Sequence, residues 1–249
     1  MINKNIEVIS LIYKSVDYLH FIAEQLQGDR CKASGWNVGV RIVANDATSQ
    51  VLAELPKIGI PYTVFNNYDA QEFYLNRVYR AYNHAVITSS YDNVCLVNSD
   101  NGFSKNWLTN LLKHHNGVNI PSSRLIESGK MDAGQHGVNL GTQNFGRSPR
   151  EFNLEDFDKW VEFNSEDKIL DGGLYMPCVF EKKRFIESGM YPCGNVYHNG
   201  IGTKDHKGKF RKSGDDFFFH DILESKYGMK HVTVFDSPVY HIVEGEKDA

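Results

Sequence analysis

The chain has 249 residues, of which 41 % are hydrophobic and 23 % are charged. This is the composition of an ordinary globular protein, which excludes a disordered, collagen-like or coiled-coil chain. The formal net charge of −4 also excludes a global basic field that would recruit nucleic acid or a membrane surface.

In chain order, short β-branched runs predict strands and apolar residues at helical spacing predict helices. The first half reads as a strand at 7–13, a helix at 16–26, strands at 38–44 and 61–65, a helix at 75–85, a strand at 94–97 and a helix at 108–115 capped by Ser104. The second half adds a short helix at 154–163, strands at 174–180 and 231–235, and a helix at 219–227 that stops at Gly228. Alternation of strands and helices predicts parallel strands joined by crossover helices, and therefore an α/β sandwich.

Two glycine-rich segments, 117–173 and 191–213, interrupt this periodicity. Long irregular segments inside a compact domain are commonly binding loops or lids. We therefore expect one domain over 1–249, with its functional loops on one edge.

The four cysteines stand far apart and form no CxxC pair. This favours a reducing compartment over a disulfide framework or a zinc site. The chain starts without the apolar core of a signal peptide, and no stretch approaches the roughly 18 apolar residues of a membrane-spanning helix. We therefore expect no transmembrane segment and a cytoplasmic location, which is the host cytoplasm if the gene is viral.

Two predicted strands are followed by acidic turns. Asp46 follows the strand at 38–44, and Asp100 follows the strand at 94–97. Open parallel sheets bind ligands at the carboxyl ends of their strands, so both carboxylates are expected at the ligand-binding edge. Because a lone Asp after a strand is usually a turn residue, the pair is the stronger signal.

The order of the motifs resembles glycosyltransferase family 2, the inverting nucleotide-sugar transferases with the GT-A fold. The family has an acidic motif after its second strand, a helix Asn ahead of an Asp-x-Asp motif, a Gly-Glu-Asp motif that opens a helix, and a late His after a strand. The matching segments here are Asn45-Asp46-Ala47-Thr48, Asn83 fifteen residues before Asn98, Asn98-Ser99-Asp100, Gly214-Asp215-Asp216 and His241. The chain departs from the family at Asn98, where the first Asp of Asp-x-Asp is a neutral amide.

The resemblance implies a GT-A-type, Rossmann-like α/β/α sandwich with a mostly parallel central sheet and long Gly-rich loops on the acceptor side. Residues 1–116 would form the nucleotide-sugar-binding half, and 117–249 the acceptor-binding and catalytic half. The nucleotide-sugar-binding residues it implies are Tyr13, Asp46, Asn83, Asn98, Ser99 and Asp100.

The resemblance also implies where catalysis takes place. Asp100 and His241 would bind Mn²⁺ or Mg²⁺, which stabilises a diphosphate leaving group as a Lewis acid. Asp216 would deprotonate the acceptor hydroxyl, with Asp215 beside it at the acceptor or ordering the loop. A simpler interpretation stays open for Asp215 and Asp216, because acidic residues in the first turn of a helix offset its dipole.

The implied activity is inverting transfer of a sugar from a nucleoside diphosphate sugar, expected to be UDP-linked, to an acceptor hydroxyl. The segment 203–212 carries five Lys or Arg against one Asp, and its basic part, 204–212, suits an anionic acceptor. The expected acceptors are a glycan or a hydroxylated or otherwise modified base in phage DNA, whose phosphates a few cations bind in a salt-sensitive way.

Two other functions remain open at this stage. A non-catalytic nucleotide-sugar or carbohydrate-binding module is compatible with the neutral Asn98. A sugar nucleotidyltransferase shares this type of sheet, but it needs a Gly-rich phosphate loop after the first strand, and residues 13–16 contain no glycine.

Overall fold

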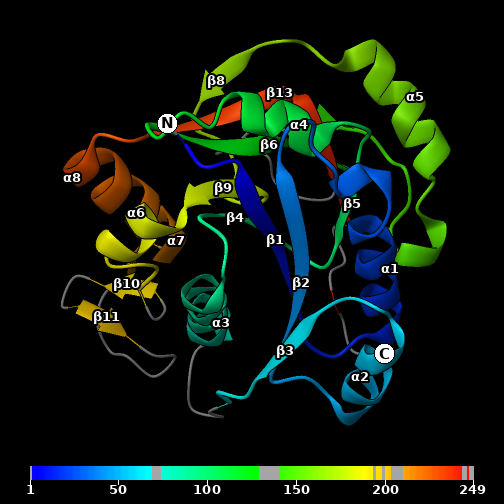
Figure 1. Ribbon diagram of the computed structural model, residues 1–249, viewed down its shortest axis with the longest axis horizontal. Coiled ribbons are helices and arrows are strands. Elements are labelled where there is room, and N and C mark those ends of the chain that lie inside the picture. Colours follow the sequence, from blue (N-terminus) through cyan, green and yellow to red (C-terminus); the bar gives the residue numbers. More distant parts are fainter. Residues whose placement is uncertain are drawn as a thin grey trace.

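The computed structural model describes residues 2–68, 74–128, 141–192, 195–197, 200–202, 210–212, 214–242 and 246 (Figure 1). Within these residues a ten-stranded sheet has the order β3-β2-β1-β4-β9-β6-β13-β5, with β7 beside β6 and β8 beside β13. Its strands are β1 (Asn5–Ile12), β2 (Asn37–Asn45), β3 (Tyr62–Phe65), β4 (Asn93–Val97), β5 (Asn101–Phe103), β6 (Asn119–Glu127), β7 (Gly141–Thr142), β8 (Ile169–Asp171), β9 (Cys178–Glu181) and β13 (Lys230–His241). A second, three-stranded sheet consists of β10 (Asn195–Tyr197), β11 (Gly200–Gly202) and β12 (Phe210–Lys212).

The helices cover both faces of the large sheet, with α1 and α2 on one side and α3, α6 and α8 on the other (Figure 1). They are α1 (Val16–Leu26), α2 (Ser49–Glu54), α3 (Tyr74–Thr88), α4 (Trp107–Lys113), α5 (Leu154–Asn164), α6 (Lys182–Glu187), α7 (Gly214–Asp216) and α8 (Ser225–Tyr227), with a π-helix, η4 (Phe217–Glu224), between the last two. Short 3₁₀ turns are η1 (Asp29–Cys31), η2 (Leu55–Lys57) and η3 (Pro149–Glu151). None of the helices in the described part of the chain has the length and hydropathy needed to cross a membrane.

The strand directions place the ends of β2 and β4 at one edge. Strands β3, β2, β1 and β4 run parallel, and β6 and β13 run parallel to each other. Strand β9 separates these groups and is antiparallel to both β4 and β6. The mostly parallel α/β sheet expected from the sequence is therefore confirmed, with β9, β5 and β8 as its antiparallel members.

The core forms two clusters, one on each face, because side chains alternate along each strand. On β1, Ile6 and Val8 pack with Leu19 of α1, whereas Ile9 and Leu11 pack with Tyr82 of α3. Strands buried on both sides are typical of parallel sheets covered by helices.

Strand β6 corrects the sequence analysis, which expected an irregular segment there. The polar residues of this strand interrupt the apolar pattern by which a buried strand is predicted. Ser122 Oγ lies 2.9 Å from His231 Nε2, and Ser123 Oγ lies 3.0 Å from Ser237 Oγ. Because these pairs satisfy the buried hydroxyl groups, a run that does not look apolar forms a central strand.

Several predicted boundaries were also wrong: the strand expected at 174–180 is β9, Cys178–Glu181, and the helix expected at 219–227 begins earlier, with α7 and η4. The strand expected to end at residue 235 continues to His241 through a register shift between Val234 and Pro238. Helix α4 begins at Trp107 after Asn106, whose φ is 60°, and Ser104 instead donates through Oγ to the carbonyl of Pro238 at 2.7 Å. Residues 238–241 therefore pair with β6, and Ser104 bonds β13, although the sequence alone placed them after a strand and at a helix cap.

Three of the cysteines, Cys31, Cys95 and Cys178, are buried free thiols, and Cys193 lies outside the described residues.

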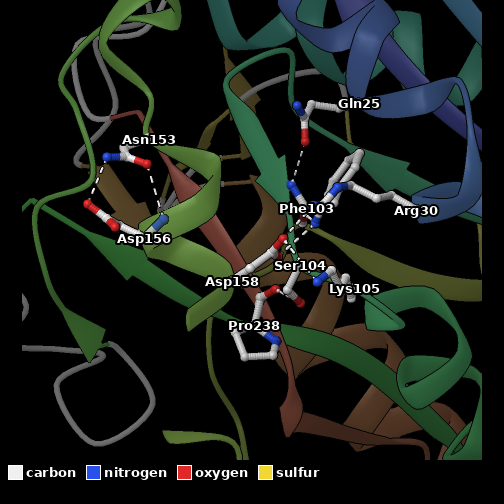
Figure 2. Close-up of polar contacts among 9 residues, drawn as sticks. All are labelled: Gln25, Arg30, Phe103, Ser104, Lys105, Asn153, Asp156, Asp158 and Pro238. Carbon is white, nitrogen blue, oxygen red and sulfur yellow. Dashed lines mark hydrogen bonds and ion pairs between the residues drawn. The ribbon is translucent and has the colours of Figure 1, made fainter. Parts of the chain in front are cut away.

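A polar network fixes β5, which directly follows Asp100 (Figure 2). Arg30 of η1 donates to the Phe103 carbonyl at 2.8 Å and forms a two-pronged ion pair with Asp158 of α5, at 2.9 and 2.6 Å. The Gln25 amide oxygen accepts from the Phe103 N–H at 3.0 Å. Helix α5 is itself capped by Asn153, which accepts from the Asp156 N–H at 3.1 Å.

Candidate active site

Asp46 is held rigidly at the carboxyl end of β2. Its backbone is left-handed, with φ 51°, a conformation that Asp tolerates better than most residues. Its Oδ1 accepts from the Asn67 N–H at 2.5 Å, and its Oδ2 lies 3.6 Å from Arg77 Nη1 of α3. The buried carboxylate therefore has a fixed direction and a cationic neighbour.

Two tyrosine rings flank the same arginine. The Arg77 guanidinium carbon lies 5.6 Å from the centre of the Tyr13 ring and 4.9 Å from that of Tyr68. Tyr13 is 36 % exposed and Tyr68 is 64 % exposed, so their faces are accessible beside Asp46. Flat aromatic faces of this kind can stack on a nucleobase.

His241 lies between two carboxylates because the register of β13 places it there. It is opposite Asn101 of β5 and opposite Glu127 of β6. Its Nε2 is 3.3 Å from Asp100 Oδ2, and its Nδ1 is 2.7 Å from Glu127 Oε1. Burial disfavours the imidazolium, but the Asp100 and Glu127 carboxylates outweigh it and raise the pKa of His241 to about 10.

Glu127 was missed by the sequence analysis, since β6 was not expected. The side chain is 2 % exposed and fixes Nδ1 of His241, so that Nε2 faces Asp100. A carboxylate behind a histidine is the usual arrangement at metal sites, where it orients the ring and increases its basicity. The sequence marks Glu127 only as an acidic residue, because the strand that it ends was not predicted.

Asn98 and Ser99 lie on the turn that carries Asp100. The Asn98 N–H donates to the Asn101 side chain at 2.9 Å, and its amide oxygen accepts from the Tyr82 hydroxyl at 3.0 Å. The Ser99 hydroxyl donates to Glu246 Oε1 at 2.9 Å. The turn is therefore tied to α3 on one side and to the C-terminal segment on the other.

Asp215 and Asp216 lie in α7, immediately before the π-helix η4. The Asp216 N–H donates to Asp215 Oδ1 at 2.9 Å, and Asp216 Oδ1 accepts a hydrogen bond from the Tyr175 hydroxyl. Burial and the adjacent Asp216 raise the pKa of Tyr175 well above its usual value, so that this tyrosine stays a proton donor. Stretches of π-helix are rare in proteins and often lie at functional sites.

Helix α3 links these separate segments. Arg77 lies beside Asp46, the Tyr79 hydroxyl accepts from the Asp215 N–H at 3.4 Å, and Tyr82 bonds Asn98. The structure thus brings the ends of β2, β4 and α7 around one helix, although they are far apart in the sequence.

Asn83, on the same helix, forms hydrogen bonds within the protein. Its Nδ2 donates to the Tyr191 carbonyl at 2.8 Å, and its Oδ1 accepts from the Tyr191 N–H at 3.1 Å. The side chain is 9 % exposed, so it anchors the backbone after α6.

Another group of potential metal ligands consists of His114, Asp167 and Asp236, whose ligand atoms lie within 4.8 Å of one another. The Lys113 ammonium is 3.5 Å from Asp236 Oδ2, which places a positive charge beside the group. Asp100 and His241 stay the ligands predicted from the sequence for the catalytic metal.

The chain matches no protein-family model, and no curated protein is significantly similar to it. Solved structures do resemble it. GalNAc-T7 with UDP, GalNAc and Mn²⁺ matches with a TM-score of 0.54 and 12 % identity, over 96 % of this chain and 44 % of that one. A mannosyltransferase from Pyrobaculum calidifontis, PcManGT, in complex with GDP-Man and Mn²⁺ matches with 0.54 and 13 %, over 97 % and 58 %.

S. aureus TarS 1–349 matches with a TM-score of 0.54 and 13 % identity, over 95 % of this chain and 60 % of that one. The chain therefore spans about half the length of the structures it resembles. At such low identity the likeness concerns the fold, and it confirms the GT-A-type architecture implied by the motifs.

Proposed function

We propose that the chain is a metal-dependent glycosyltransferase that moves a sugar from a nucleoside diphosphate sugar to an acceptor hydroxyl with inversion. The observation that carries the proposal is His241, whose Nε2 is turned toward Asp100 by the buried Glu127. Two of the similar structures contain Mn²⁺, one with UDP and the other with GDP-Man, and this supports the same class of donor and metal here.

The side chains fit a divalent cation that replaces the proton on His241 Nε2. A carboxylate oxygen of Asp100 and the imidazole of His241 approach within 3.3 Å, and nitrogen and oxygen ligands together suit Mn²⁺ better than Mg²⁺. When bound, the cation supplies Lewis-acid stabilisation of the diphosphate leaving group.

The remaining roles fall to residues around α3. Asp46 hydrogen-bonds the nucleoside, and Tyr13 stacks on its base. Asp216 accepts the proton of the acceptor hydroxyl while that oxygen attacks the anomeric carbon from the face opposite the leaving diphosphate. The hydrogen bond from Tyr175 holds the Asp216 carboxylate in one orientation.

The acceptor is a glycan or a hydroxylated base in DNA. The basic residues at 204–209 that motivate the DNA alternative lie outside the described residues, whereas 210–212 form β12. If DNA is the acceptor, its binding weakens steeply between low and physiological salt. Binding that does not depend on salt would leave a neutral glycan.

The decisive experiment incubates the protein with UDP-, GDP- and dTDP-sugars in the presence of Mn²⁺ and measures free nucleoside diphosphate. We expect release with one donor, most readily a UDP-sugar, and loss of release after chelation. Absence of release with every donor, together with tight sugar binding, would instead identify a non-catalytic binding module.

A further inference from the structure

The carboxylate of Glu246 accepts hydrogen bonds from three backbone N–H groups near the start of the chain and from the Ser99 hydroxyl. The N–H of Tyr13 lies 3.2 Å from both carboxylate oxygens. The N–H groups of Lys14 and Ser15 donate to Oε2 at 2.7 and 3.0 Å. The Ser99 hydroxyl donates to Oε1 at 2.9 Å. Glu246 is more than two hundred residues from the first three donors, so the contact is a tertiary one.

These four donors are suited to binding an anion. Three successive backbone N–H groups lead into α1, whose N-cap is Ser15, and the dipole of this eleven-residue helix favours negative charge at that end. Consecutive N–H groups in a turn form a concave nest that binds phosphate oxygens as readily as carboxylates. The occupant seen in the structure is an anion supplied by the chain itself.

The anion site lies at the candidate active site. Ser99 directly precedes Asp100, the proposed metal ligand, and Tyr13 is the proposed platform for the base. If a nucleoside diphosphate stacks its base on Tyr13 and binds the metal at Asp100, its phosphoryl oxygens lie close to the N–H groups of residues 13–15 and to the Ser99 hydroxyl.

We propose that the N–H groups of Tyr13, Lys14 and Ser15, together with the Ser99 hydroxyl, form a binding site for a phosphoryl group, and that Glu246 occupies it as an intramolecular competitor. Phosphoryl binding displaces the Glu246 carboxylate, because a phosphoryl group on the same N–H groups would occupy the place of the carboxylate and be repelled by its charge. The assignment of the phosphoryl group to a sugar donor rests on the proposed function, whereas the anion site does not.

The test measures binding of inorganic pyrophosphate and of UDP by calorimetry, to the wild type and to Glu246→Gln. The neutral amide competes less well for the N–H groups, so we expect both ligands to bind Glu246→Gln at least threefold more tightly. The control is Glu162→Gln, which makes the same charge change at an exposed position of α5 and is expected to bind like the wild type.

A second measurement locates the effect. The amide proton resonances of residues 13–15 should shift when Glu246 is replaced and shift again when pyrophosphate is added. Equal or weaker binding by Glu246→Gln, or pyrophosphate binding that leaves these resonances unchanged, would overturn the proposal. Because pyrophosphate binding requires no turnover, failure of the donor panel would leave this result intact and would refute only the proposed function.

Discussion

At the scale of single residues, Glu127 controls the direction in which His241 presents its nitrogen atoms. Replacing it by Gln keeps the volume but removes the charge behind the imidazole, so we predict that Glu127→Gln binds Mn²⁺ about 10- to 100-fold more weakly than the wild type. Mn²⁺ affinity is read directly by electron paramagnetic resonance of the free ion. His241→Ala should show a larger loss.

The matched control for this prediction is Glu162→Gln, exposed on α5 and remote in sequence from the site. If Glu127→Gln and the control bind Mn²⁺ equally well while His241→Ala binds weakly, Glu127 does not position the ligand. If His241→Ala also binds normally, the metal lies elsewhere.

Asp216 is the residue whose replacement separates binding from turnover. In Asp216→Asn the amide cannot take up the acceptor proton, and general-base catalysis contributes about 10²- to 10⁴-fold in rate. We predict a loss of kcat of this size with an unchanged Kd for the donor. Retained turnover would assign the proton to another group, with the neighbouring Asp215 as the first to test.

At the scale of elements, a buried ion pair joins two strands to α3. Arg41 of β2 donates to Glu7 of β1 at 2.9 Å and to the Ala85 carbonyl of α3 at 2.6 Å. The side chains are only 8 % and 10 % exposed. Because α3 also contacts Asp46, Asn98 and Asp215, this pair supports the helix around which the site is built.

We predict that Glu7→Gln lowers the free energy of unfolding by about 3–5 kcal/mol, since it leaves the buried Arg41 charge without its partner. Urea unfolding measures this change. Glu155→Gln breaks an exposed pair with Lys159 on α5 and should leave the unfolding midpoint unchanged, because surface pairs contribute little. Equal effects of the two variants would contradict the role assigned to burial.

At the scale of the whole molecule, His115 makes stability depend on pH. Burial lowers its pKa from 6.5 to about 4, and its Nε2 donates to Asn93 Oδ1 at 2.8 Å. Below pH 6.5 the unfolded chain binds a proton that the folded protein does not accept until about pH 4. The free energy of unfolding therefore falls as the pH is lowered through this window and is fully retained above it.

The expected contribution of His115 between pH 7 and pH 5 is a loss of about 2 kcal/mol. It is measured by urea unfolding of the wild type and of His115→Gln at both pH values, with a chelator present. Carboxylates affect both proteins alike, so the difference between them isolates the histidine. The same pH dependence in both proteins would show that His115 does not titrate in this way.

The sequence by itself determined the fold class and the positions of the acidic turns. Helical spacing predicted α1 and α3, and β-branched runs predicted β1, β2 and β4. Both patterns arise because residues that face the core must be apolar, and they recur with the period of the helix or strand. The motif order then implied the GT-A-type fold and singled out Asp46, Asp100, Asp216 and His241, whose roles stay predictions.

Only the tertiary structure decided which of these groups meet, and which unrecognised residues support them. Strand β6 contains buried serines whose hydrogen-bond partners lie on β13, so no local sequence pattern predicts this strand. Glu127, at the end of β6, was therefore missed as well. The contact between Glu246 and residues 13–15 joins opposite ends of the chain. Periodicity reports only whether a residue is buried, whereas strand register and long-range hydrogen bonds depend on the packing of the complete chain.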